Sequence, residues 1–194
     1  MLTSQEESTL LAVARDTLEQ FVANQPPPEV EHLANTPMLR QDRATFVTLR
    51  EQNGDLRGCI GSTTHTAPLI VSVRDNTIRS AGHDPRFEAV APNELDGLEI
   101  EVSALMDGDD PGLPFRRVAA LDEIVIGRDG LYLERGGQGA GLLLPQVASE
   151  RNWDVSQFLD ALCRKSGLAP DAWQTPDAAL FRFGAHIFAE PKSG

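Results

Sequence analysis

Residues 44–61 read ATFVTLREQNGDLRGCIG, which is two β-prone runs on either side of Asn53-Gly54. Asn-Gly between such runs is the strongest short signal for a β-hairpin with a two-residue turn. We therefore predict a hairpin here, and its turn fixes which residues of the two strands lie opposite each other. With this turn, the expected pairs are Val47 with Ile60, Thr48 with Cys59, Leu49 with Gly58, Arg50 with Arg57 and Glu51 with Leu56. A longer or bulged turn would shift this register and remove the pairing of Arg50 with Arg57.

The segments around this hairpin predict three helices. A capping-box pattern at Ser4–Glu7, followed by a helical apolar face, predicts a helix over about residues 5–23. Apolar residues at helical spacing after Pro68 predict a second helix that ends near Gly82. Asp154, with Gln at the third helical position, predicts the start of a third.

Further strands are predicted on both sides of the chain's middle. Alternating apolar and polar residues predict a strand over 98–103 and a last strand over 181–187, the latter with Phe181, Phe183, Ala185 and Ile187 facing the core. Asp129-Gly130 predicts a second hairpin between residues 123–127 and 131–135. Helices and hairpins in this mixed order favour an α+β fold, an antiparallel sheet with flanking helices. We expect one domain over residues 1–194, with two lobes and a linker at about 106–116.

Charge and composition exclude several classes of partner. The chain of 194 residues has 29 acidic and 17 basic residues, a net charge of -12, and the basic residues are scattered. Such a charge repels phosphate backbones and anionic lipids, so we expect neither nucleic acid nor a membrane as a partner. The charged residues within the first 20 positions fit no signal peptide, and two distant cysteines fit reduced thiols, so we expect a cytoplasmic protein.

The segment LRGCIG at residues 56–61 resembles the signature of the AMME-syndrome candidate family, also called AmmeMemoRadiSam system protein A. The likeness continues through DPRF at 84–87, EL at 94–95, LEIEVS at 98–103 and GLLLPQV at 141–147, and so covers most of the chain. It implies a compact α+β fold with a larger and a smaller lobe. It also implies two partners, a Memo-like protein and a radical S-adenosylmethionine enzyme, and names no reaction, cofactor or substrate.

The candidate site lies on the second strand of the first hairpin. In the predicted register Arg50, Arg57 and Cys59 share one strand face, where two opposed guanidinium groups would attract an anion. A neighbouring guanidinium also favours the thiolate form of cysteine, so Cys59 and Arg57 are the candidate catalytic residues. Gly58 and Gly61 leave room for a ligand to approach, and His65 follows closely in sequence. The alternative is structural: Glu99 and Glu101 would neutralise the arginines, and Cys59 would be buried.

No metal site is predicted. His65 and His83 could in principle join Cys59, but no spacing typical of zinc ligands accompanies them. Cys163 lies on the apolar face of the third predicted helix, so we expect it in the core. Two functions stay open: a subunit that handles a small molecule or anion at the LRGCIG strand, and a non-catalytic adaptor for the two implied partners.

Overall fold

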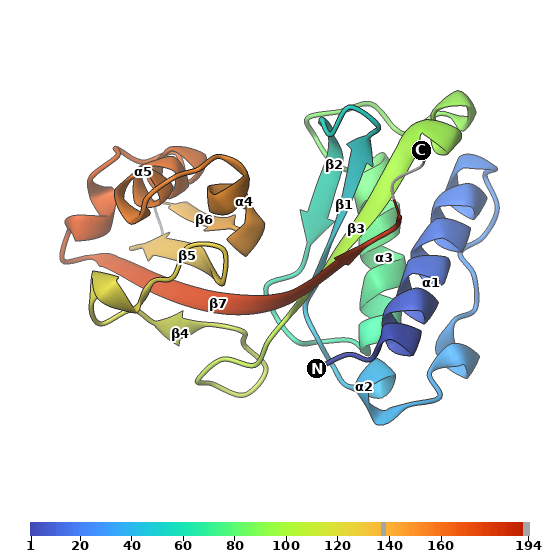
Figure 1. The fold of residues 1–194 in the computed structure, drawn as a ribbon, viewed down its shortest axis with the longest axis horizontal. Helices are drawn as coiled ribbons and strands as arrows, with labels where there is room; N and C mark the ends of the chain where they lie inside the picture. The colour runs from blue at the N-terminus through green and yellow to red at the C-terminus, as the bar shows by residue number, and fades with distance from the viewer. Residues whose placement is uncertain (137–138, 192–194) are drawn as a thin grey trace. The chain divides into compact units, whose positions relative to one another are not determined.

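The computed structural model describes residues 1–136 and 139–191, which form two compact units. Unit 1 comprises Met1–Leu105 and the C-terminal segment that begins at His186, and unit 2 comprises Met106–Ala185. Helices and strands occur in both units (Figure 1). The predicted α+β class, with an antiparallel sheet and flanking helices, is confirmed. That both units make one domain joined by a linker at about 106–116 stays a prediction.

Unit 1 is built from three α-helices and a sheet. The helices are α1 (Ser4–Val22), α2 (Pro37–Arg40) and α3 (Leu69–Gly82), with short 3-10 helices η1 (Glu31–Leu33) and η2 (Pro92–Gly97). The strands are β1 (Thr45–Glu51), β2 (Leu56–Gly61), β3 (Leu98–Leu105) and the end of β7 (Ala178–Ala189). Their order is β2-β1-β3-β7, so β2 is the edge strand.

The core of unit 1 lies between one face of this sheet and helices α1 and α3. Figure 1 shows both helices on the same side of the strands. Val47 and Leu49 of β1 and Ile100 of β3 face them and are fully buried. Because side chains alternate along a strand, Thr48 and its neighbours in the adjacent strands point to the other face. That second, polar face carries the candidate site.

The predicted bounds of α1 and α3 agree closely with the structure, but the first cap is shifted by one residue. Thr3, not Ser4, caps α1: its hydroxyl accepts a hydrogen bond from the Glu6 N–H at 3.3 Å, and the Glu6 carboxylate accepts from the Thr3 N–H at 2.8 Å. The capping-box pattern, a hydroxyl residue followed three positions later by Glu, fits the sequence twice. It fits Thr3 with Glu6 and also Ser4 with Glu7.

Unit 2 packs two helices on a smaller sheet. Its elements are β4 (Arg116–Arg117), η3 (Leu121–Glu123), β5 (Asp129–Arg135), β6 (Gly139–Leu143), α4 (Pro145–Glu150), α5 (Val155–Lys165), η4 (Ala172–Gln174) and the first part of β7. β5 lies between β6 and β7, and β4 pairs with β7. Leu131 and Leu133 of β5 are buried with Phe158 and Leu162 of α5, whose predicted capping box at Asp154 is confirmed.

One strand prediction in unit 2 was wrong, and the predicted core face of β7, which runs from unit 2 into unit 1, is confirmed only in part. The second hairpin is absent from the described residues: 125–129 form a turn in which the Asp129 carboxylate accepts from the Val125 N–H at 2.8 Å, and β5 pairs with β6 and β7 instead. Asp129 thus holds a turn that begins at Val125 rather than shaping a hairpin. In β7, Phe183 is buried as predicted, but Leu180 and Phe188, on the alternate positions, are also buried. The strand therefore uses opposite faces at different points along its length.

Candidate functional site

The first hairpin has a three-residue loop, one residue longer than predicted. The Gly54 N–H donates to the Glu51 carbonyl at 2.8 Å, and the Glu51 N–H donates to the Asp55 carbonyl at 2.9 Å. Gly54 has φ +88°, the left-handed conformation that follows a type I turn in such loops. The Asn53 side chain accepts from the Asp55 N–H at 2.8 Å, which favours this turn over the two-residue form.

A β-bulge then changes the register in the middle of the hairpin. Val47, Thr48 and Leu49 pair with Ile60, Cys59 and Gly58 as predicted, but Arg50 pairs with Leu56. Arg57 is the extra residue of the bulge, so the predicted opposition of Arg50 and Arg57 was wrong. Bulges commonly redirect a side chain, and the Arg57 side chain reaches Glu94 and the Glu88 carbonyl.

Arg57 forms an ion pair with Glu94, which was not predicted as its partner. Its Nε donates to Glu94 at 2.7 Å, and its Nη2 donates to Glu94 at 3.1 Å and to the Glu88 carbonyl at 3.0 Å. The hydrogen bonds with Glu94 raise the pKa of Arg57, and those from Arg57 lower the pKa of Glu94. Only a tenth of the Arg57 side chain is exposed, and Phe87 lies 5.7 Å from its guanidinium. Glu94 thus takes the role expected of Glu99 and Glu101 at this arginine.

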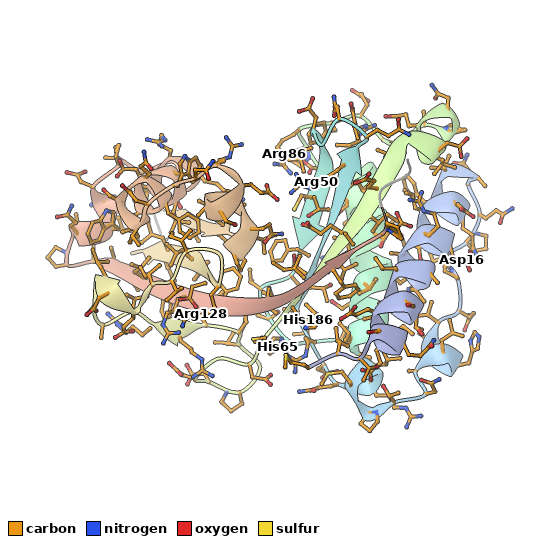
Figure 2. All side chains as sticks on the ribbon, in the orientation of Figure 1. Asp16, Arg50, His65, Arg86, Arg128 and His186 are labelled. Carbon is orange, nitrogen blue, oxygen red and sulfur yellow. The ribbon has the colours of Figure 1, made fainter. Side chains whose placement is uncertain are left out.

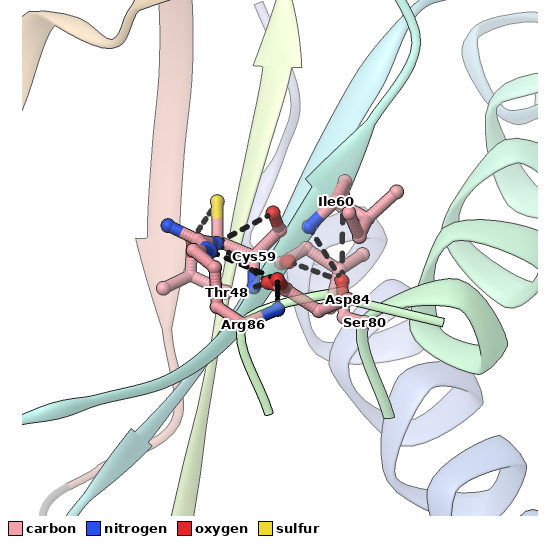
Figure 3. Close-up of polar contacts among 7 residues, drawn as sticks. Thr48, Cys59, Ile60, Ser80, Asp84 and Arg86 are labelled. Carbon is pink, nitrogen blue, oxygen red and sulfur yellow. Dashed lines mark hydrogen bonds and ion pairs between the residues drawn. The ribbon is translucent and has the colours of Figure 1, made fainter. Parts of the chain in front are cut away.

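Cys59 is held by the segment that follows α3 (Figure 3). Its N–H donates to the Asp84 carboxylate at 2.9 Å, and its carbonyl accepts from Nη2 of Arg86 at 3.2 Å. The Thr48 hydroxyl donates to the Cys59 sulfur at 3.4 Å. The thiol is half-buried. Both backbone groups of an edge-strand residue are therefore occupied by side chains, and the thiol keeps a defined position.

Asp84 and Arg86 form the charged pair of this site. Two nitrogens of Arg86 donate to the carboxylate, at 2.8 and 2.5 Å. These bonds, with that from Cys59, lower the pKa of Asp84 from 3.8 to about 2 despite its burial. The same hydrogen bonds raise the pKa of Arg86, and the nearby Cys59 contributes less. About half of the Arg86 side chain is exposed, so its guanidinium, unlike that of Arg57, is open to a solute.

The two glycines of LRGCIG allow close packing rather than open space. A Cβ on Gly58 would lie 2.3 Å from the Ser80 carbonyl oxygen of α3, and one on Gly61 would lie 2.3 Å from the Phe46 ring. The Ser80 hydroxyl also accepts from the Ile60 N–H at 2.8 Å and donates to the Val47 carbonyl at 2.7 Å. The space that we had expected a ligand to use at Gly58 and Gly61 is filled by the protein itself.

The polar face of the sheet carries a row of three chemically active side chains. Thr48 of β1 lies opposite Cys59 of β2 on one side and Glu101 of β3 on the other. Residues directly opposite in neighbouring strands point to the same face. In the next polar row, Arg50 lies opposite Glu99. A thiol, a hydroxyl and a carboxylate thus follow one another across three strands.

The comparison with known proteins gives the family. The family model AMMECR1 matches residues 11–188. The chain belongs to the AMMECR1 family. It is 40% identical over 202 residues to a protein of Methanothermobacter thermautotrophicus, covering 97% of this chain and 96% of that one. It is also 40% identical over 194 residues to a protein of Thermococcus kodakarensis, covering 93% of this chain and 88% of that one.

A solved structure shares the AMMECR1 fold seen here. The crystal structure of an uncharacterized protein from Pyrococcus horikoshii matches with a TM-score of 0.84 and 36% identity, covering 93% of this chain and 89% of that one. The similarity to this structure therefore extends over nearly the whole AMMECR1 chain. The range of the family match, residues 11–188, includes the hairpin, α3 and the segment that holds Cys59.

His65 lies away from Cys59 in this AMMECR1 protein. Its Nδ1 accepts from the Ala44 N–H at 2.7 Å, next to the start of β1. Cys59 pairs with Thr48, four residues further along, which is about 13 Å at the rise of a β-strand. Figure 2 shows His65 at one end of unit 1 and Arg50 and Arg86 towards the other. His65 therefore joins the hairpin to its flanking loop and is not part of the thiol site.

Cys163 is fully buried among Phe158, Leu159 and Leu162, as predicted, and burial raises the pKa of its thiol.

Within residues 1–136 and 139–191, no group of three or more His, Cys, Asp or Glu side chains could hold a metal ion. Across the same residues, no helix has the length and apolar character needed to cross a membrane. Sequence reasoning missed the site roles of Asp84, Arg86 and Glu94, which lie beyond α3. The family likeness at residues 84–87 and 94–95 was the available signal for them.

Proposed function

We propose that this protein handles a small molecule at the polar sheet face around Cys59, with the thiol as the reactive group. The observation that carries the proposal is the fixed position of Cys59: Asp84 holds its N–H, Arg86 its carbonyl and Thr48 its sulfur. A side-chain hydroxyl directed at a half-buried thiol supports a role for the sulfur beyond packing. Glu101, opposite Thr48, supplies a carboxylate on the same face that could accept a proton.

The ligand that this site favours is an anion, and Arg86 replaces Arg57 as the group that would attract it. Arg57 is buried against Glu94, whereas Arg86 has half of its side chain exposed beside the Cys59 carbonyl. A guanidinium recognises carboxylate and phosphate groups through paired hydrogen bonds. Asp84 and the Cys59 carbonyl together use Nε and Nη2 of Arg86, so a ligand would bind at Nη1.

Two alkylating reagents of similar size test both parts of this proposal. Iodoacetate and iodoacetamide each form a sulfur–carbon bond with release of iodide, and they differ in charge. We expect the rate ratio of iodoacetate to iodoacetamide at Cys59 to be at least about threefold higher in the native protein than in the urea-unfolded protein. Arg86→Met should remove this increase, and Arg86→Lys should keep part of it. Arg164→Met, at an exposed arginine of α5, is the matched control.

The outcomes separate the two claims. If the rate ratio of iodoacetate to iodoacetamide is equal in native and unfolded protein, the site has no preference for anions, although the thiol can still be reactive. If Cys59 reacts no faster than the buried Cys163, the proposal that the Cys59 thiol is the reactive group is wrong.

Within the family, we propose that the protein acts as AmmeMemoRadiSam system protein A, with a Memo-like protein and a radical S-adenosylmethionine enzyme as partners. Membership of the family and the LRGCIG segment at β2 support it. The net charge of -12 supports the exclusion of nucleic acid and of anionic membranes as partners. Co-expression of the three proteins followed by light scattering tests for a complex. Cys59→Ser should leave an adaptor's complex intact but abolish thiol-dependent handling of a small molecule.

A further inference from the structure

A cavity of about 470 Å³ lies beside β2 on the sheet face opposite the Cys59 thiol. Ile60 contributes the strand side of this cavity, and because it follows Cys59 directly, its side chain points to the opposite face. The remaining lining residues come from α3 and the residue after it, and they are Asp75, Ile78, Arg79 and His83. The volume lies within the range of small-molecule sites.

The spacing of these residues places them on one stripe of α3. Asp75, Ile78 and Arg79 are three and four residues apart, and His83 follows Arg79 by four. Residues at these spacings are neighbours on a helix surface. Two apolar groups, Ile60 and Ile78, are therefore flanked by two basic ones along a single groove.

The two basic side chains are the unusual feature of this cavity. Arg79 and His83 are exposed and, within the described part of the chain, their side chains make no hydrogen bond or ion pair. Asp75, the acidic group nearby, accepts from Nε of Arg74 at 2.8 Å, and Arg74 also pairs with Glu31 at 3.3 Å. Arg79 thus offers a positive charge without a carboxylate partner among the described residues, in a protein whose net charge is -12, and His83 adds a ring nitrogen beside it. Arg57 and Arg86, by contrast, each pair with a carboxylate.

Compensation of the helix dipole explains only part of this arrangement. Basic residues near a helix C-terminus are favourable, and Arg79 and His83 lie in the last turn of α3 and just after it. The dipole does not explain why half-buried isoleucines from two different elements lie beside them. An anionic head with an apolar tail would fit both parts of the groove.

We propose that this cavity binds an aliphatic carboxylate, with Arg79 and His83 holding the carboxylate and Ile60 and Ile78 contacting the alkyl chain. A charged guanidinium gives the stronger hydrogen bonds, and the alkyl chain gains by leaving water. The site is distinct from the Cys59 thiol, since the two lie on opposite faces of β2.

Methyl NMR of isoleucine-labelled protein tests the proposal with hexanoate as the probe. We expect hexanoate to shift the δ1-methyl signals of Ile60 and Ile78, and hexanamide, which lacks the charge, to bind at least about tenfold more weakly. The double variant Arg79→Gln/His83→Gln should weaken hexanoate binding by at least about tenfold as well. Arg164→Gln, in the last turn of α5, is also an exposed arginine without an ion pair among the described residues and should change nothing.

Each alternative result has a definite meaning. Unshifted Ile60 and Ile78 signals, or equal affinity for hexanoate in the double variant, would overturn the site. Equal affinity for hexanamide would overturn the charge recognition. Binding of acetate or inorganic phosphate as tightly as hexanoate would overturn the role of the isoleucines.

Discussion

The Asp84 carboxylate accepts a hydrogen bond from the backbone N–H of Cys59 at 2.9 Å, while Arg86, two residues later, donates to the Cys59 carbonyl at 3.2 Å. An edge strand normally leaves such groups free to pair with another chain. At Cys59 a carboxylate and a guanidinium take the place of that neighbour. The same two residues therefore protect the sheet edge and position the thiol.

The first prediction concerns Asp84 and acid. Its pKa is lowered from 3.8 to about 2, so the ionised carboxylate adds roughly 2 kcal/mol of stability that is fully present above about pH 4 and is lost as the pH falls towards 2. Asp84→Asn should therefore unfold more easily at pH 7, and its deficit relative to wild type should shrink between pH 4 and pH 2. Urea unfolding at a series of pH values measures both proteins.

Other carboxylates with lowered pKa, such as Glu6 and Glu94, affect wild type and variant alike and cancel in this comparison. Asp122→Asn, at an exposed position, is the control and should leave the pH dependence unchanged. A deficit for Asp84→Asn that stays constant from pH 7 to pH 2 would contradict the assignment.

The second prediction concerns the glycine of the hairpin that touches α3. Gly58→Ala would place a Cβ 2.3 Å from the Ser80 carbonyl oxygen, so strand and helix must move apart, at a cost of about 2–3 kcal/mol. Gly97→Ala is the matched control, because its Cβ would meet nothing within 4 Å. Thermal unfolding of both variants measures the difference. Similar melting temperatures would show that α3 does not pack on β2 as described.

The third prediction concerns the buried ion pair. Arg57→Met and Glu94→Gln should each destabilise the protein, and the double variant should lose less than the sum of the two. We expect a coupling energy of roughly 2 kcal/mol, since a third of the Glu94 side chain remains exposed and water weakens the pair. Urea unfolding of the four proteins gives this value. A coupling energy near zero would return Arg57 to the candidates for ligand binding.

The fourth prediction compares the two cysteines. Native Cys59 should react with iodoacetamide at least about tenfold faster than Cys163, because Cys163 is fully buried and its pKa is raised by that burial. Mass spectrometry of timed aliquots follows each cysteine separately. In urea the two rates should converge, which shows that the native difference comes from the fold.

Local patterns predicted most of the fold. The alternation at residues 98–103 and the helical spacing after Pro68 depend on neighbours in sequence, and both elements formed where expected. The hairpin of residues 44–61 also formed, with three of its five predicted pairs. The loop of Gln52, Asn53 and Gly54 was harder to predict, because Asn-Gly fits a two-residue turn and a three-residue loop equally well.

The candidate site could be predicted less well, because its partners are distant in sequence. Arg57 and Cys59 were found from one strand, but Glu94 and Asp84 reach them from 37 and 25 residues away. Because of a one-residue bulge, the neighbour of Arg57 is Glu94 and not Arg50, as the predicted register had it. The pairing in the second half failed for a related reason: Asp129-Gly130 resembles a hairpin turn, whereas the Asp129 carboxylate holds a turn that begins at Val125.

Strand β7, residues Ala178–Ala189, pairs in unit 2 and then enters unit 1, and it follows every other strand in sequence. Because the ribosome makes the chain from its N-terminus, β3 and β5 are both synthesised long before the strand that will lie beside them. Until β7 has been synthesised, both sheets of the nascent protein are therefore incomplete, and each has an edge strand open to unwanted pairing. A pause or a truncation before residue 178 would leave both units unfinished at once, so their biogenesis is coupled through the last strand to be made.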